Sequence, residues 1–464
     1  MTLAGKRPGR DSRSLFLCRT MRRWWAPGPK AGHCVLTCIK AAPRRGGNTA
    51  AMVDSRAHDP LSPSLLAEAP HRLLFFVGAV NVLLAMAWWA LWLIDAHWQL
   101  GWLPVAPIYA GWVHAIVMQY QLLPPFMFGF LLTVFPRWMG LPELQRWHYV
   151  PVGVGLFGGQ LAVIAGMLLG LEAWVQIGLF MTTAGWAYGL VQLLRLLLAE
   201  HRARKGPTWH AWSCFAAMTL GFIGLLCVLV FLHGANPWWM FVAIKLGTFG
   251  LLLPVYLTVA HRMFPFFAGN VVAGYKPWRP LWLLAAIWCL LLVHLVLELL
   301  HAYAFLWWVD VPFALLTGYL LYRWWPRSAA PGLLWVLFIG FAWLPLAFAL
   351  YAMQSLLYAT TGEYLLGRGP AHALYIGFFG SLLVAMVTRV TQGHSGRPLA
   401  MPKAGWFAFA VLQLVAILRV IADVMPDPAL WQILAALGWL LAFLPWVLRS
   451  AGIYLRPRID RRPG

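Results

Sequence analysis

Several histidines of this 464-residue chain lie inside or at the ends of long apolar stretches. An imidazole is costly at membrane depth and usually binds something there. His114 lies near the start of one stretch, His372 opens another and His233 closes a third, whereas His294 and His301 are seven positions apart and so share one helix face. Neutral imidazole is a common ligand for iron and copper. The pattern predicts that these five histidines meet at a haem or metal site.

His114 and His372 are the leading predicted ligands, and the other three are second choices. Haem b in a helical bundle commonly takes its axial ligands from facing helices. Met118 follows His114 by four positions and offers a thioether sulfur, which suits Cu(I). Ordinary packing of this methionine is the alternative interpretation.

Two charged residues within the apolar stretches accompany these histidines. Lys245 lies in the middle of one stretch, where it needs an acidic partner, a cofactor carboxylate or a polar cavity. Glu298 lies between His294 and His301 in the sequence, so it could orient either imidazole as a hydrogen-bond acceptor. The sequence identifies no catalytic acid or base, and it leaves enzymatic activity open.

The elements that must position these residues are membrane-spanning helices. The chain is 61% hydrophobic and only 11% charged, which excludes a soluble domain of this length. A hydrocarbon core takes about 20 apolar residues per helix, and the lipid bilayer is therefore the first predicted partner. We predict an all-α polytopic membrane protein with about twelve transmembrane helices, near 72–95, 107–135, 149–170, 173–198, 209–233, 237–260, 279–301, 303–325, 332–358, 370–391, 405–424 and 429–449.

The net charge of +21 predicts topology rather than a nucleic-acid partner. The basic residues lie in alternate loops and in both tails, whereas the other loops are short and carry acids such as Glu172, Glu363 and Asp427. Cytoplasmic loops of membrane proteins carry an excess of Lys and Arg. Both termini are therefore predicted to be cytoplasmic, with the five histidines in the outer half of the membrane.

The chain divides into three predicted parts. Residues 1–70 form a basic, disordered tail with a weak Cys/His cluster, and Met52 is a plausible true start. Residues 71–450 form the membrane domain, and residues 451–464 form a basic cytoplasmic tail.

The histidines of the cytoplasmic side are predicted to have a simpler role. They adjoin Arg or Trp at span ends, where an imidazole hydrogen-bonds lipid headgroups or loops. This group consists of His71, His148, His201, His210, His261 and His394.

Three segments carry a family resemblance. They read G-F-L-L-T-V-F-P-R-W-M-G at 129–140, H-R-M-F-P-F-F at 261–267, and H-A-L-Y-I-G-F-F-G-S-L-L-V-A-M-V-T-R-V-T-Q-G-H-S-G-R-P-L at 372–399. The chain resembles the NnrS family over most of residues 71–450. The resemblance implies a multi-pass protein of the bacterial inner membrane that holds haem and copper and protects against nitric oxide and nitrosative stress, in connection with denitrification.

The resemblance also carries over individual motif residues. They are Arg262, His372, Arg389, His394 and Arg397. The two last-named arginines would pair with haem propionates only if the haem lay toward the cytoplasm. Since the histidines predict an outer position for the haem, anchoring and topology are the roles expected of these arginines.

One departure from the family concerns copper. Many members carry H-A-H-E-M where this chain has His114, Ala115, Ile116, Val117 and Met118. The first His and the Met are kept, and the second His and the Glu are replaced. If the missing pair binds copper in other members, this chain holds haem alone or uses another copper site.

Two other functions are compatible with twelve spans. A secondary transporter of a small solute could use Lys245 and Asp310 as an ion-coupled site at the midplane, and it would have unwound helices. A quinol-linked haem oxidoreductase would need a second bis-histidine pair, which the sequence does not offer clearly.

Overall fold

Helices make up nearly all of the regular structure. The computed structural model describes residues 61–204, 206–234 and 236–460, and no strand occurs within these ranges. The first half contains η2 (Pro63–Glu68), α2 (Pro70–Trp98), α3 (Ala110–Ile116), η3 (Val117–Leu122), α4 (Pro124–Met139), η4 (Arg146–His148), α5 (Val150–Leu169), α6 (Glu172–Arg202), α7 (Trp209–Gly234), α8 (Pro237–Lys245) and η5 (Leu246–Leu252). The second half contains α9 (Leu253–Val271), α10 (Trp282–Leu299), η6 (Tyr303–Phe305), α11 (Trp307–Trp324), α12 (Gly332–Thr361), α13 (Gly369–His372), η7 (Ala373–Gly380), α14 (Ser381–His394), α15 (Lys403–Ile421), η8 (Ala422–Val424) and α16 (Pro428–Tyr454).

Within the described residues, eleven continuous helical segments are long and apolar enough to cross a membrane. The one further predicted span, near 303–325, is present as α11. This helix has 18 residues, with Asp310 in its first turn and Arg323 in its last. These charges and its tryptophans make α11 less apolar than the other eleven. The prediction of an all-α polytopic membrane protein is confirmed, and the cytoplasmic position of the termini stays a prediction. The predicted N-terminal tail lies mostly outside the described residues.

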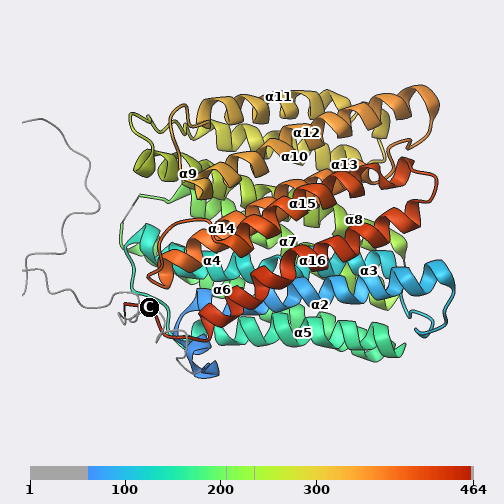
Figure 1. Ribbon diagram of the computed structural model, residues 1–464, viewed down its shortest axis with the longest axis horizontal. Coiled ribbons are helices and arrows are strands. Elements are labelled where there is room, and N and C mark those ends of the chain that lie inside the picture. Colours follow the sequence, from blue (N-terminus) through green and yellow to red (C-terminus); the bar gives the residue numbers. More distant parts are fainter. Residues whose placement is uncertain (1–60, 205, 235, 461–464) are drawn as a thin grey trace, which may run out of the picture. The chain divides into compact units, whose positions relative to one another are not determined.

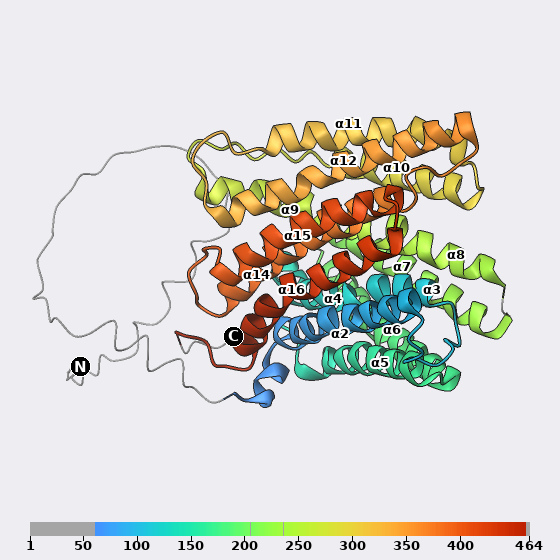
Figure 2. The same cartoon turned by 45° about the vertical axis from the view of Figure 1, so that its right-hand side comes forward.

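The long helices run side by side across the bundle (Figure 1). α2 packs against α4, α5 and α16, so the first and last spans of the described part are neighbours. At the opposite side of the bundle, α11 packs against α12, as both views show (Figure 2). The loops rich in Arg and Lys follow every second span and therefore lie at one end of the bundle, here called the basic end.

Small residues allow α5 and α6 to approach closely. A Cβ atom added to Gly155 would lie 2.6 Å from the Cα of Gly185, and one added to Gly159 would lie 2.7 Å from the carbonyl oxygen of Gly178. Helices in membranes associate largely through such close backbone packing. The small-xxx-small spacing of Gly155 and Gly159 therefore has a packing role.

Three of the spans are locally widened into π-helix. The segments are η3, η5 and η7, which lie in the second, sixth and tenth spans, four spans apart. They meet through polar side chains: Gln119 Nε2 donates to Thr248 Oγ1 at 3.1 Å and to the Tyr375 hydroxyl at 2.5 Å, and the hydroxyls of Thr248 and Tyr375 also contact each other. π-helical turns often occur at functional sites. This regular recurrence is a feature that the sequence analysis did not find.

Candidate functional site

His114 and His372 line the same pocket although they lie 258 positions apart in the sequence. His372 ends the short helix α13, where Gly369 and Pro370 begin a new helical turn after a loop. Its Nδ1 atom lies 2.9 Å from the carbonyl oxygen of Arg368. Because a carbonyl only accepts, Nδ1 carries the proton and Nε2 keeps its lone pair. An imidazole held in this way is oriented as metal-bound histidines usually are.

His114 reaches the pocket from α3. Its ring stacks on Trp89 of α2, with centroids 4.2 Å apart and planes 14° from parallel. Its Nδ1 atom is buried and has no hydrogen-bond partner among the described residues. A buried polar atom without a partner costs free energy, so its presence points to a ligand that completes it.

Two guanidinium groups complete the polar side of the pocket. Arg419 of α15 lies on the wall, where its Nη1 donates to Asp423 at 3.1 Å, and Arg368 lies beside it on the loop before α13. The apolar walls come from α2, η7 and α16. They are formed by Met86, Trp89, Ile376, Ala435, Ala436 and Trp439.

The donor set of this pocket would suit a metal ion or the iron of a haem. Two neutral imidazoles suit iron and copper, and guanidinium groups suit the carboxylates of a haem. The pocket volume is about 70 Å³. Pockets that hold drug-sized ligands occupy roughly 300–1,000 Å³. An ion with a diatomic ligand fits without rearrangement, whereas a whole macrocycle would require the tryptophan walls to move.

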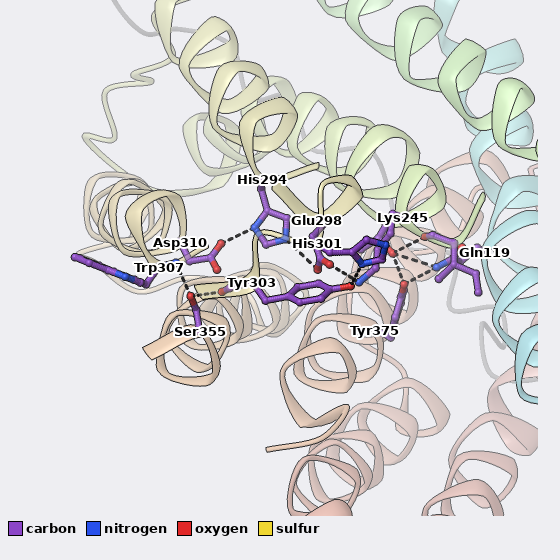
Figure 3. A network of polar contacts seen from close by, with 12 residues as sticks. Gln119, Lys245, His294, Glu298, His301, Tyr303, Trp307, Asp310, Ser355 and Tyr375 are labelled. Atoms are coloured by element: carbon purple, nitrogen blue, oxygen red, sulfur yellow. Dashed lines mark hydrogen bonds and ion pairs between the residues drawn. The ribbon is translucent and has the colours of Figure 1, made fainter. Parts of the chain in front are cut away.

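A second polar cluster lies around His294, which is fully buried. His294 Nδ1 donates to Asp310 Oδ1 at 2.6 Å, and its Nε2 lies 3.6 Å from Glu298 Oε1. Glu298 Oε2 in turn lies 2.8 Å from the Nζ atom of Lys245. Figure 3 shows this chain of contacts running from Asp310 to Lys245. The acidic partner that Lys245 was expected to need is therefore Glu298, and Lys245 and Asp310 belong to one network that Glu298 and His294 connect.

Lys245 and Glu298 of this cluster also line a larger cavity, here called the tyrosine cavity. Its volume is about 440 Å³. It is lined by Lys245, Glu298, Tyr303, Leu306, Tyr351, Gln354, Ser355, Tyr358, Tyr364, Gly367, Arg368, Pro370 and Ala371. Arg368 lines both this cavity and the His114/His372 pocket, so the two hollows are neighbours.

The five histidines do not meet at one site. His301 is exposed, and its Nδ1 contacts the Tyr303 hydroxyl at 2.6 Å. His233 is exposed, bonds to the carbonyl of Leu229 at 2.8 Å and touches the edge of Phe180. No group of three or more His, Cys, Asp or Glu residues within the described part of the chain could hold a metal ion. The prediction that the five histidines meet at one site is wrong. Side chains at the same depth in the membrane can still point in different directions around the bundle. Met118 is half-buried within η3 and does not line the pocket.

Two histidine pairs at the basic end were not predicted. His210 Nε2 lies 2.9 Å from His261 Nδ1, and His261 Nε2 lies 3.2 Å from the Pro280 carbonyl, so His210 donates to His261. The rings of His71 and His394 lie 4.0 Å apart. His210, His261 and His71 are buried and so lie away from lipid headgroups, whereas the bond of His261 to the Pro280 carbonyl is one of the predicted bonds to a loop. Sequence spacing could not pair residues from distant spans.

Two of the three arginines of the family motifs stack over aromatic rings. Arg389 stacks over Phe267 at 3.8 Å, and Arg262 stacks over Trp138 at 4.3 Å. Neither arginine lines the His114/His372 pocket, and Arg397 lies beyond α14 at the basic end. Burial lowers the pKa of the Arg397 guanidinium, with neighbouring Arg449 and Arg456 adding to the effect. Their positions agree with a role in anchoring the basic end.

The fold and these hollows define an all-helical, multi-pass membrane protein with a two-histidine pocket and a buried ion network. The sequence profile of the family described as NnrS protein matches residues 65–458. The chain therefore belongs to the NnrS family, as its three segments predicted. Among curated protein sequences, none matches this chain.

Proposed function

We propose that this protein is a haem-binding protein of the bacterial inner membrane that protects the cell against nitric oxide and nitrosative stress, in connection with denitrification. The observation that carries the proposal is the shared pocket of His114 and His372. Membership of the NnrS family supports the same reading.

One of the two imidazoles, of His372 or His114, would hold the haem iron while the other lines the same pocket, and Arg419 and Arg368 would bind the carboxylates of haem b. The Arg368 carbonyl holds the His372 ring so that Nε2 faces outward from that bond. When bound, haem iron supplies a site that takes up a diatomic gas. Trp89 and Trp439 would have to move to admit the macrocycle, and their rings beside it would then limit the entry of water.

Copper is the second cofactor of this proposal, and fewer residues of this chain support it. Ile116 and Val117 replace the family's second His and Glu, and both are buried apolar residues. Copper would then depend on His114, His372 and a sulfur such as that of Met118, which must turn toward the pocket. We expect less than one copper per chain.

The test is a reduced-minus-oxidised absorption spectrum of the detergent-purified protein, with iron and copper analysis of the same sample. We expect a Soret band that shifts when nitric oxide is added. His372→Ala and His114→Ala should each remove or displace that band. His233→Ala is the matched control, because His233 is exposed and lies outside the pocket, and it should leave the spectrum unchanged.

Either of two results would overturn the proposal. A folded protein without haem, after expression with ample haem supply, would move transport of a small solute to first place. A Soret band that survives in both pocket variants would place haem elsewhere in the bundle.

A further inference from the structure

The tyrosine cavity has hydrogen-bond donors that the protein itself does not use. Gln354 of α12 is 6% exposed and lines the cavity. Its Oε1 atom accepts the backbone N–H of Leu366 at 2.8 Å, which fixes the orientation of the amide. Its Nε2 atom is buried and has no hydrogen-bond partner in the described part of the chain. Two N–H donors are thus held at the wall of a hollow without an acceptor, which points to a ligand that supplies one.

The charges on the wall favour a negative ligand. The cavity is lined by two cations, Lys245 and Arg368, and by one carboxylate, Glu298. Glu298 is already paired with Lys245 at 2.8 Å and lies beside His294. Within the described part of the chain, no carboxylate forms an ion pair with the Arg368 side chain, and Asp423 accepts only the backbone N–H of this residue. The wall therefore carries one formal positive charge in excess.

The remaining wall is suited to a flat, apolar body. Tyrosine rings from η6, α12 and the loop before α13 form most of it, with Leu306 and Pro370. Aromatic side chains pack well against planar ligands and keep a polar tip for orientation. The volume of about 440 Å³ lies within the range of roughly 300–1,000 Å³ typical of small-molecule sites.

We infer that the tyrosine cavity is a binding site for an organic monoanion, a carboxylate carried on a planar and largely apolar body. The carboxylate accepts hydrogen bonds from Gln354 Nε2 and the Arg368 guanidinium, and the body lies among the tyrosine rings. This site shares Arg368 with the proposed cofactor site, but Gln354 and the tyrosine rings lie outside that site, and the binding does not depend on a metal at His114 and His372.

The probe is 2-naphthoate, which has this chemistry, with 2-naphthalenemethanol as its neutral counterpart. Calorimetric titrations use the full chain in nanodiscs of phosphatidylcholine, with empty nanodiscs subtracted. We expect saturable binding of naphthoate, at least about tenfold tighter than the alcohol, because only the carboxylate forms charge-assisted hydrogen bonds with the Arg368 guanidinium.

Two variants test the assignment. Gln354→Glu keeps the acceptor for Leu366 but replaces the free donors by a negative charge, and it should abolish naphthoate binding. Arg368→Gln should weaken binding by about tenfold or more. Gln99→Glu, the same change in an exposed loop at the same end of the bundle, is the control and should bind as the parent does.

Three results would each overturn the inference. They are no saturable naphthoate binding by the folded parent protein, equal affinity for naphthoate and the alcohol, or unchanged naphthoate binding in folded Gln354→Glu.

Discussion

The Nζ atom of Lys245 lies 2.8 Å from Oε2 of Glu298, and the two residues come from neighbouring helices, α8 and α10. The Glu298 side chain is 4% exposed and that of Lys245 is 23% exposed. Glu298 connects Lys245 to His294, and His294 connects to Asp310. The pair thus neutralises the one lysine of α8 at membrane depth and joins two spans and α11 in a single polar network.

Removing Glu298 should destabilise the protein strongly. Glu298→Gln leaves Lys245 and His294 without their shared carboxylate, and breaking a buried pair costs about 3–5 kcal/mol. The partial exposure of Lys245 allows some solvation, so we expect about 2–3 kcal/mol and a clear fall in the melting temperature. Thermal unfolding of the purified protein in detergent measures it.

Glu143→Gln is the control for this prediction. Arg137 and Glu143 form a pair at 3.2 Å in which both side chains are largely exposed. Exposed pairs contribute about 0–1 kcal/mol, so this variant should melt close to the parent. Equal melting temperatures for Glu298→Gln, Glu143→Gln and the parent would contradict a stabilising role of the network.

Glycine at position 159 should be needed for the packing of α5 on α6. A Cβ atom there would lie 2.2 Å from Thr182 Oγ1, which is held by hydrogen bonds to the Gly178 carbonyl and from Gln121. Because Thr182 cannot turn away freely, Gly159→Ala should cost about 1–3 kcal/mol. Gly318→Ala, where the nearest atom lies 3.9 Å away, should have little effect on the melting temperature. Because alanine favours a helix more than glycine does, equal melting temperatures for the two variants would show that the contact with Thr182 does not decide the outcome.

The fold was largely predictable because a hydrocarbon core demands long apolar helices, and the sequence shows each of them. The helix with the weakest hydrophobic signal in the sequence was α11, because Asp310 and Arg323 reduce its apolar character. The π-helical segments were not predictable in the same way. They depend on how Gln119, Thr248 and Tyr375 meet across three spans, and no local pattern encodes that contact.

The candidate site was predictable only in part. The depth of His114 and His372 in their spans predicted that they could lie together, and both line one pocket. Depth says nothing about the direction a side chain points around the bundle. For this reason His233 was grouped with residues that it does not approach, and the buried pair of His210 with His261 was missed.

The Tyr375 hydroxyl should hold the junction of the three π-helical segments. Tyr375→Phe removes its contacts with Gln119 and Thr248 and leaves the bond of 3.1 Å between those two. Each lost hydrogen bond costs about 0.5–1.5 kcal/mol, so we expect faster hydrogen exchange in η7 and its neighbours. Tyr322→Phe, at an exposed tyrosine, should leave exchange there unchanged. Unaltered exchange over Ala373–Gly380 in Tyr375→Phe would rule out this role.

The orientation of the bundle should follow its charged loops. Trp102 is exposed in the loop after α2, at the end that lacks basic loops, and Trp147 is exposed in the Arg-bearing loop before α5. Since basic loops remain in the cytoplasm, a cysteine at Trp102 should react with a membrane-impermeant maleimide in intact cells, and one at Trp147 should react only after permeabilisation. Both variants are made in a chain whose six natural cysteines are replaced. Labelling of Trp147→Cys but not Trp102→Cys in intact cells would invert the predicted topology and move the His114/His372 pocket to the cytoplasmic side.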